Sequence, residues 1–276
     1  MNLFIMGNGF DIDHNIKSSY ADFKNYLVNL DDLEATTCIE IMEKGHNNSQ
    51  GDLWSQLEKN LGHLNLDYVI NNNFEYLTQT ITLSEIFSKL FKGWVNQLDN
   101  ERKSKKQLQQ LINPTNDLFF TFNYTNTLEY IYNVNESNIK YIHVVKEGEF
   151  YEFGHKKIEI DTSSFHYNFG VSNFFKQQLI KDTSSIFQRN SDWFHGLKNY
   201  EINSLYFYGF SFADIDLIYI KGILNNIDEK QLKSIHLYSY KGQLKDDYNN
   251  QKHILIDLLR DANIELEVEK FEMLGD

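Results

Sequence analysis

Short apolar runs alternate with longer amphipathic stretches along the chain. Each run is brief and gives way to a glycine or a polar residue, which favours a buried strand over a helix. The runs predict strands at residues 2–6, 118–122, 139–145, 151–154, 157–160, 204–208, 233–240 and 264–271.

Between these runs, apolar residues recur every three or four positions. In residues 80–98, for example, Ile81, Phe87 and Leu90 fall on one stripe, as in an amphipathic helix. Pro114 separates a mostly helical stretch from the strand at 118–122, because proline disfavours the helical state of the residue before it. Helices are predicted at residues 20–30, 33–44, 53–61, 80–98, 108–112, 125–132, 173–187, 215–224 and 247–261, the first capped by Ser18 or Ser19. This alternation of strands and helices predicts an α/β fold.

Composition and charge narrow the function classes. The chain has 276 residues, a net charge of −13 and one cysteine, Cys38. The negative charge disfavours a general nucleic-acid-binding protein, which would carry a basic stripe. A single cysteine excludes an intramolecular disulfide and a metal site built from cysteines. No apolar stretch is long enough to span a membrane and no leader sequence is recognisable, so we expect a cytoplasmic protein without membrane contact.

A glycine-containing turn follows the first predicted strand. Glycine lets backbone amides approach a phosphate closely, and the helix after the turn adds a positive end. The same residues also suit a tight turn without a ligand, and the third glycine of the dinucleotide fingerprint is absent. The candidate ligand-binding residues of this turn are Gly7, Asn8, Gly9, Phe10, Asp11 and His14.

The strand at 118–122 runs directly into a second polar segment. Asn123 lies where the carboxyl end of the strand is expected, and its amide can both donate to and accept from ribose hydroxyls or a water. Thr121, two residues before Asn123, and Tyr124, the next residue, are further candidate ligand contacts. The alternative is an Asx turn or a helix cap at Asn123.

Two histidines, His143 and His155, each lie at the end of a predicted strand. Histidine is the side chain used most often as a general base near neutral pH. Both are therefore candidate catalytic bases, with a purely structural role as the alternative.

The strand at 204–208 is followed by a similar segment. Gly209 ends the strand, and Ser211 and Asp214 lead into a predicted helix. They suit either a phosphate or ribose contact or a cap of that helix. Ala213 occupies the position of the second glycine in a G-x-S-x-G nucleophile elbow, which disfavours an esterase.

The order of these motifs resembles the AbiH family of bacteriophage abortive-infection proteins. The matching segments are residues 4–11 with His14, residues 19–23, Trp54 and Glu58, residues 121–125 with 127–129 and Tyr132, the histidine–glycine elements, and Gly209 with Ser211 and Asp214 or Asp216. This resemblance implies an anti-phage function, with a phage-derived trigger or a defence partner protein.

The AbiH family is in turn similar to the sirtuin-like NAD-binding fold, a Rossmann-like fold with a mainly parallel sheet. That likeness implies NAD as ligand or substrate, Asn123 as the active-site asparagine and His143 as the catalytic histidine. Val144 follows His143 where the sirtuin-like motif has glycine, which makes His155 the substitute base. Thr125 also stands where sirtuin-like proteins carry aspartate.

The motifs are far apart in sequence, yet each follows a predicted strand. If one sheet gathers them, the chain is a single α/β domain over residues 1–276 with a helical insertion at 20–113.

Three functions are compatible with these residues. The leading one is an anti-phage protein that binds a nicotinamide or adenine nucleotide and hydrolyses NAD to arrest the infected cell, with no metal required. The second is a nucleotide-sensing or scaffold module without catalysis. The third is a metal-dependent RNase toxin, with a cation held by Asp11, Asp13, Asp214 and Asp216. The sequence identifies no oligomer interface, which leaves a homo-oligomer open.

Overall fold

The computed structural model describes residues 1–45, 53–54, 57–64, 76–98, 104–145, 150–157, 177 and 179–273. The chain divides into two compact units, each made of separate stretches of sequence. Unit 1 comprises Met1–Ile16, Asn100–Val144 and Thr183–Asp276, and unit 2 comprises Lys17–Asp99 and Val145–Asp182. The helical insertion predicted at 20–113 falls mostly on unit 2, and the single domain stays a prediction.

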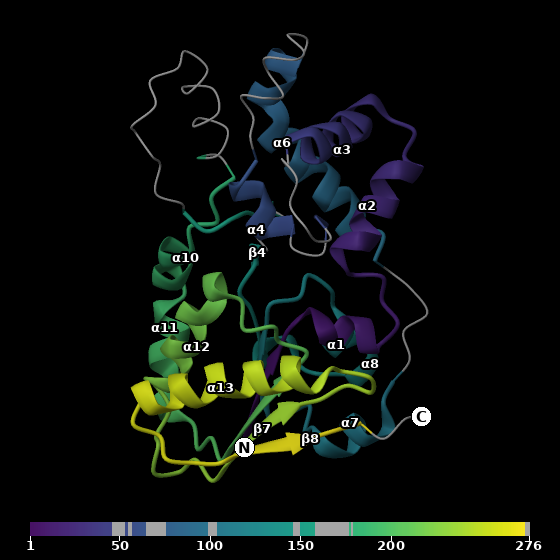
Figure 1. Cartoon of the computed structure of the whole chain (residues 1–276). Coiled ribbons are helices and arrows are strands. Elements are labelled where there is room, and N and C mark those ends of the chain that lie inside the picture. Colours follow the sequence, from purple (N-terminus) through teal and green to yellow (C-terminus); the bar gives the residue numbers. More distant parts are fainter. Residues whose placement is uncertain are drawn as a thin grey trace. The chain divides into compact units, whose positions relative to one another are not determined.

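Unit 1 contains a six-stranded parallel sheet, and Figure 1 labels two of its strands, β7 and β8. In spatial order the strands are β3 (Ile139–Tyr141), β2 (Leu118–Thr121), β1 (Asn2–Met6), β6 (Ser204–Tyr208), β7 (Ser234–Tyr238) and β8 (Val268–Phe271), and every neighbouring pair is parallel. The chain builds outward from β1 to β3 and then returns to the other side of β1 at β6. This is the order of a doubly wound sheet, with its reversal between β1 and β6. The predicted Rossmann-like α/β class is confirmed.

Helices cover both faces of this sheet. The helices of unit 1 are α1 (Asn8–Asp13), α7 (Lys106–Leu111), α8 (Thr127–Tyr132), α10 (Thr183–Arg189), α11 (Ser191–Gly196), α12 (Leu217–Leu224) and α13 (Lys245–Asp261), with short 3₁₀ turns η1 (Glu136–Asn138), η3 (Leu197–Asn199) and η4 (Asp214–Asp216). A strand that is covered by helices on both faces has a continuous apolar sequence and not an alternating one. Continuous apolar runs therefore made most of these strands predictable from the sequence.

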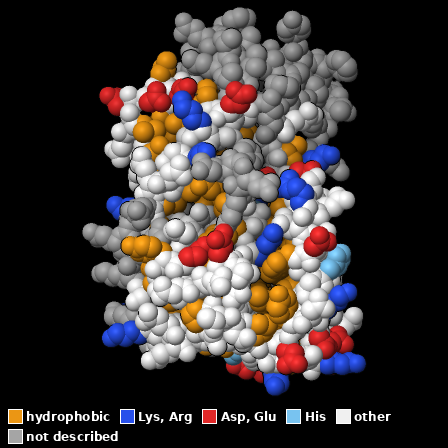
Figure 2. Space-filling model, turned by 180° about the vertical axis from the view of Figure 1, so that it is seen from behind, with side chains coloured by type: hydrophobic (Ala, Val, Ile, Leu, Met, Phe, Trp, Pro, Cys, Tyr) orange, Lys and Arg blue, Asp and Glu red, His pale blue; other side chains and the backbone are white. Residues whose placement is uncertain are grey.

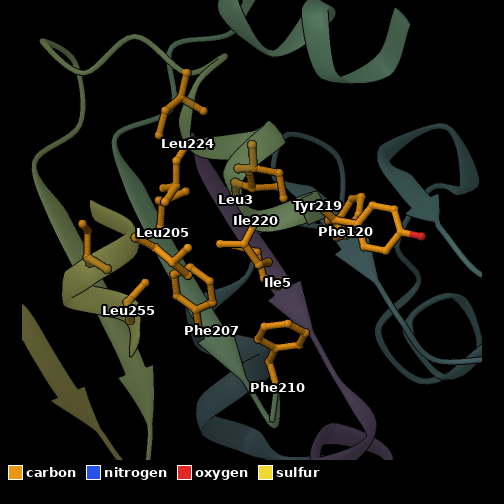
Figure 3. Packing of buried hydrophobic residues seen from close by; sticks show 14 of the residues in the cluster. Leu3, Ile5, Phe120, Leu205, Phe207, Phe210, Tyr219, Ile220, Leu224 and Leu255 are labelled. Carbon is orange, nitrogen blue, oxygen red and sulfur yellow. The ribbon is translucent and has the colours of Figure 1, made fainter. Parts of the chain in front are cut away.

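The two faces of the sheet carry separate apolar clusters. On one face, Leu3, Ile5 and Phe207 pack with residues of α10 to α13, and Figure 3 shows Tyr219 and Ile220 of α12 in this cluster. On the other face, the cluster contains residues of β1 and β2 together with residues of α1, α7 and α8. Unit 1 is therefore a three-layer arrangement of helices, sheet and helices.

Unit 2 is mainly helical and includes a small two-stranded sheet. Its helices are α2 (Tyr20–Asn29), α3 (Leu33–Gly45), α4 (Leu57–Gly62) and α6 (Tyr76–Val95), and β4 (Val144–Val145), at the boundary of the units, pairs with β5 (Phe150–Tyr151). The ring of Phe23 is surrounded by Trp54, Phe87, Phe91 and Trp94, with centroids 5.2 to 6.3 Å away. The predicted cap of α2 is confirmed at Ser19, whose hydroxyl accepts from a backbone N–H.

Some predicted boundaries are wrong, and tertiary contacts explain them. The strand predicted at 139–145 is interrupted after β3, because residues 142–143 bend away once the ladder to β2 ends. In the helix predicted at 173–187, residues 179–182 are not helical and α10 begins at Thr183. There the backbone pairs with His155 instead, in an isolated parallel bridge at Ile180.

Three other predictions need adjustment. Residues 53–54 are a turn and α4 begins only at Leu57, so the helix predicted at 53–61 starts later. The strand predicted at 151–154 is reduced to β5, which ends at Tyr151. The strand predicted at 157–160 lies outside the described residues beyond position 157.

The surface and the helices bear on two of the functional alternatives. Within the described chain, no helix is long and apolar enough to cross a membrane. Figure 2 shows acidic and basic side chains scattered among polar and apolar ones, without a Lys and Arg stripe among the coloured residues of that face.

Candidate functional site

Four predicted motifs meet at one edge of the sheet in unit 1. Gly7 follows β1, Asn123 follows β2, His143 follows β3 and Gly209 follows β6, and these four strands are neighbours in the sheet. Because all four are parallel, their carboxyl ends lie at the same edge, where ligands of doubly wound sheets bind. The strand order thus brings together residues that are far apart in sequence.

The glycines of this edge pack two turns against each other. The Gly7 N–H donates to the Tyr208 carbonyl and the Gly9 N–H donates to the Gly209 carbonyl, both at 2.9 Å. A Cβ at Gly9 would lie 2.7 Å from the Gly209 Cα, and Gly209 itself has φ +65°. The glycines therefore permit a close approach of backbone to backbone, and the Gly7 and Gly9 amides are engaged within the protein. Between them Asn8 is exposed, whereas Phe10 is buried in the apolar cluster.

Asp11 is buried and ties α1 to the segment after β2. The Thr125 hydroxyl lies 2.9 and 2.8 Å from its two carboxylate oxygens, and the Thr127 hydroxyl lies 3.2 Å from Oδ1. Thr125, at the position of the sirtuin-like aspartate, therefore contacts the carboxylate of Asp11. This contact gives Asp11 a structural role in the unliganded protein.

His14 is also buried, and both of its ring nitrogens have partners. Nδ1 lies 2.6 Å from the Phe10 carbonyl oxygen, which can only accept, so Nδ1 carries the proton. Nε2 then accepts from the Tyr132 hydroxyl at 2.5 Å, and that hydroxyl accepts the Lys105 backbone N–H at 2.9 Å. Burial lowers the pKa of His14, which keeps the ring neutral. The ring nitrogens of His14 are therefore used in hydrogen bonds within α1 and between α1 and α8.

Asn123 differs from these residues. Asn123 is only 5% exposed. Neither Oδ1 nor Nδ2 of its side chain has a hydrogen-bond partner within the described part of the chain. Its backbone is held, because its N–H donates to the Thr121 hydroxyl at 3.1 Å. A buried polar group without a partner costs about 1–3 kcal/mol and calls for an explanation. A ligand with hydroxyl groups would supply the missing partners.

His143 lies at the next strand end, in the bend after β3. It is 3% exposed, and its Nε2 lies 3.5 Å from Oδ1 of Asp216, the last residue of η4. This distance is long for a hydrogen bond and short enough for an ion pair when the ring is protonated. The structure therefore places a carboxylate beside the candidate base.

Aromatic rings surround this histidine. The Phe122 ring meets the His143 ring edge-on at a centroid distance of 5.4 Å, and the Tyr219 ring does so at 5.9 Å. Phe210 stacks on Phe122 at 4.6 Å. The Tyr124 ring lies 6.3 Å from that of His143. Such an enclosure lowers the local dielectric and strengthens interactions with any charge formed there.

The remaining predicted residues of this edge are placed as follows. Thr121 is buried at the end of β2, and Tyr124 is half-buried. Ser211 and Asp214 are exposed, and neither caps a helix, since α12 begins without a side-chain cap. The helix-cap alternative for these two residues is wrong, and their role in ligand binding stays a prediction.

His155 belongs to unit 2 and is described within it. Its backbone N–H donates to the Leu179 carbonyl at 2.9 Å, and its Nδ1 lies 2.7 Å from the Lys156 carbonyl. Also in unit 2, the buried ammonium of Lys181 lies 3.3 Å from a carboxylate oxygen of Glu58, the acid of the Trp–Glu motif. The histidine–glycine element and this motif therefore contribute to the internal packing of unit 2.

The acidic residues of the RNase alternative do not form a metal site. The Asp13 carboxylate accepts from the hydroxyls of Tyr208 and Tyr238 and lies 3.4 Å from the ammonium of Lys105. Asp11 and Asp216 face threonines and a histidine, as described above. In the ranges that the structure describes, no three His, Cys, Asp or Glu side chains gather to hold a metal ion.

These features define a doubly wound α/β protein with a polar, aromatic-lined sheet edge. A family profile described as bacteriophage abortive infection AbiH matches residues 3–82 and 74–238, and the chain belongs to this family. Membership indicates a function in abortive infection, in agreement with the motif order of the sequence. No curated protein and no solved structure matches the chain. The further likeness to the sirtuin-like fold stays a prediction.

Sequence analysis did not select Tyr219, whose ring lies 5.9 Å from that of His143. It named Asp216 only as an alternative to Asp214 and as a metal ligand of the RNase alternative. The geometry of η4 decides that Asp216, and not Asp214, lies beside His143.

Proposed function

We propose that this protein acts in abortive infection by binding a nicotinamide nucleotide at the carboxyl edge of β1, β2, β3 and β6 and hydrolysing NAD. The buried side-chain amide of Asn123, which lacks a partner in the described chain, is the observation that carries the proposal. Loss of NAD would then arrest the infected cell.

The side chains of Asn123 and His143 are suited to the chemistry of NAD cleavage. Release of nicotinamide builds oxocarbenium character on the ribose, as in glycoside hydrolysis. The leaving group already carries positive charge, so no general acid is required. Asn123 would hold ribose hydroxyls by donating and accepting, and His143 would activate the attacking water or hydroxyl.

The contacts favour the ribosyl end of the nucleotide over its phosphates. The Gly7 and Gly9 amides, which a phosphate would need, donate to carbonyls of the facing turn. The partnerless amide and the histidine lie instead at the ends of β2 and β3. We therefore expect recognition to depend on the nicotinamide ribose more than on the pyrophosphate.

The test is incubation of the purified protein with NAD, alone and with phage lysate as an activator, followed by quantification of free nicotinamide. Asn123→Ala and His143→Gln are expected to lower turnover by about 10²-fold or more. Asn116→Ala, at an exposed loop position before β2, is the matched control and should keep wild-type turnover. Absence of wild-type turnover under every condition would reject hydrolysis, and unchanged turnover in Asn123→Ala would reject the site.

A nucleotide sensor without catalysis is the second candidate function. It is favoured by Val144, which follows His143 where the sirtuin-like motif carries glycine. Mass spectrometry of small molecules retained through purification separates the two functions. A nucleotide recovered with its glycosidic bond intact after long incubation, and lost from Asn123→Ala, would select the sensor.

A further inference from the structure

The candidate base His143 has a carboxylate close to one of its ring nitrogens, although no hydrogen bond joins them in the described part of the chain. Nε2 of His143 lies 3.5 Å from Oδ1 of Asp216, and the two side chains are 3% and 12% exposed. Buried pairs are screened by salt much less than surface pairs are. His143 comes from the bend after β3 and Asp216 from the end of η4, so the fold, and not sequence proximity, creates the contact.

A carboxylate selects one form of the neutral imidazole. It can only accept, so the nitrogen facing it must carry the proton, because two lone pairs in that position would repel. With Asp216 as the neighbour of Nε2, the neutral form expected for His143 carries its proton on Nε2 and the lone pair that a base needs on Nδ1. The rings of Phe122 and Tyr219 both meet the imidazole at an interplanar angle of 69°, which limits its rotation.

We propose that Asp216 is a positioning residue that holds His143 with its proton on Nε2 and its lone pair on Nδ1. A carboxylate in this position also stabilises the imidazolium that forms when the base takes up a proton. Only this catalytic consequence rests on the proposed NAD hydrolysis, since the pairing itself is a property of the folded chain. Tyr124 and Tyr219 are further titratable side chains near the ring.

The experiment reads the tautomer directly on the full-length protein. A long-range ¹H–¹⁵N spectrum of protein labelled with ¹⁵N-histidine, recorded at neutral pH, separates protonated from unprotonated ring nitrogens. His143→Gln assigns the relevant signals by their disappearance. We expect wild-type His143 to show a protonated Nε2 and an unprotonated Nδ1.

Asp216→Asn tests the cause of this state. The carboxamide is nearly the same shape, but its NH₂ group can donate to Nε2, so we expect a shift toward the form protonated on Nδ1. Asp214→Asn, on the same 3₁₀ turn but exposed, is the control and should leave the spectrum unchanged. A wild-type proton on Nδ1 alone, or nitrogen signals unchanged by Asp216→Asn, would overturn the proposal. If Asp216→Asn does not fold, the tautomer of His143 in the wild-type protein still tests the proposal.

The NAD assay separates this inference from the proposed function. Asp216→Asn is expected to lower kcat by about 10²–10⁴-fold, the usual contribution of a positioned base, with little change in KM. A spectrum as expected together with no NAD turnover by the wild type would retain the His143–Asp216 pair and reject the hydrolysis. A fall in turnover caused only by a higher KM would instead count against a positioning role.

Discussion

At the scale of single residues, the buried polar groups of unit 1 differ in whether they have partners. Asp11 accepts from two threonine hydroxyls, and His14 has a partner at each ring nitrogen. Neither oxygen nor nitrogen of the Asn123 amide has one among the described residues. The hydrogen bonds of Asp11 and His14 hold α1 and the segment after β2 in place. A buried amide without a partner instead raises the free energy of the protein while no ligand is bound. This difference supports the proposal that Asn123 recognises the ligand, while Asp11 and His14 hold the surrounding structure in place.

This difference predicts that Asn123→Leu will stabilise the unliganded protein. Leucine has a similar shape and needs no hydrogen bond, so the free energy of unfolding should rise by up to about 1–3 kcal/mol. Urea titration followed by circular dichroism measures the change, and Asn116→Leu, at an exposed position, should stay within about 0.5 kcal/mol of wild type. Clear destabilisation by Asn123→Leu would mean that the amide has a protein partner.

The buried His14 predicts a loss of stability in mild acid. Burial holds the folded-state pKa of His14 below the ordinary histidine value of 6.5, so the unfolded chain takes up a proton first as the pH falls through 6.5. The free energy of unfolding should then fall by at most about 1.4 kcal/mol per pH unit for this group, and by nothing at higher pH. His236, whose pKa burial also lowers, contributes in the same direction.

The measurement is urea unfolding between pH 7.5 and 5 for wild type and His14→Gln. The variant should be less stable at pH 7.5 and show a shallower pH dependence, because one of the two histidines is gone. Equal slopes for the two proteins would show that His14 is not buried in its neutral form.

At the scale of elements, two turns are held against each other by backbone contact. The turn between β1 and α1 and the turn after β6 approach so closely that side chains cannot fit between them. This contact fixes the start of α1, and with it the position of the residues that follow. The glycines after these strands are therefore explained by packing, whether or not a nucleotide binds nearby.

Gly209→Ala should accordingly destabilise unit 1. The added Cβ would lie 2.2 Å from the Phe10 backbone nitrogen, and the φ of +65° is unfavourable for alanine, so we expect a loss of about 2 kcal/mol or more. Gly196→Ala is the matched control, because a Cβ there meets nothing within 4 Å and the residue ends helix α11. Thermal unfolding of both variants checks this, and an equal effect of the two substitutions would contradict it.

At the scale of the whole molecule, the chain forms two compact units from five stretches of sequence. Unit 1 carries the parallel sheet and the Asn123–His143 edge, and unit 2 carries an aromatic interior around Phe23. Cys38, the one cysteine of the chain, lies fully buried in α3 of unit 2. It is therefore a natural reporter for the opening of unit 2.

Cys38 should not react with thiol reagents while unit 2 is folded. Burial raises the pKa of the thiol, and Glu34 and Asp32 raise it further, so little reactive thiolate forms. We expect a thiol-exchange reagent to modify Cys38 only as urea unfolds unit 2. Lys241→Cys in a Cys38→Ala background, with the thiol at an exposed position, should react at once and serves as the control. Equally fast modification of Cys38 in the native protein would contradict the packing of α3.

Much of the sheet was predictable from local pattern. The strands expected at 2–6 and 204–208 occur with those bounds, because both are apolar runs that are largely buried and end at glycine. Helix boundaries were less predictable where tertiary pairing competes, as at Ile180, which forms a bridge where a helix was expected. The site was predictable as a set of strand ends, whereas its internal partners were not.

The sequence by itself determined the α/β class, the strand-end motifs and membership of the AbiH family, because apolar runs and short motifs are local properties of the chain. Only the tertiary structure decided that Gly9 packs against Gly209, that Asp216 rather than Asp214 faces His143, and that the Asn123 amide has no partner in the described chain. The physical reason is that packing and hydrogen bonding depend on which strands become neighbours in the sheet. The strand order β3-β2-β1-β6, which no local pattern encodes, placed these residues at one edge.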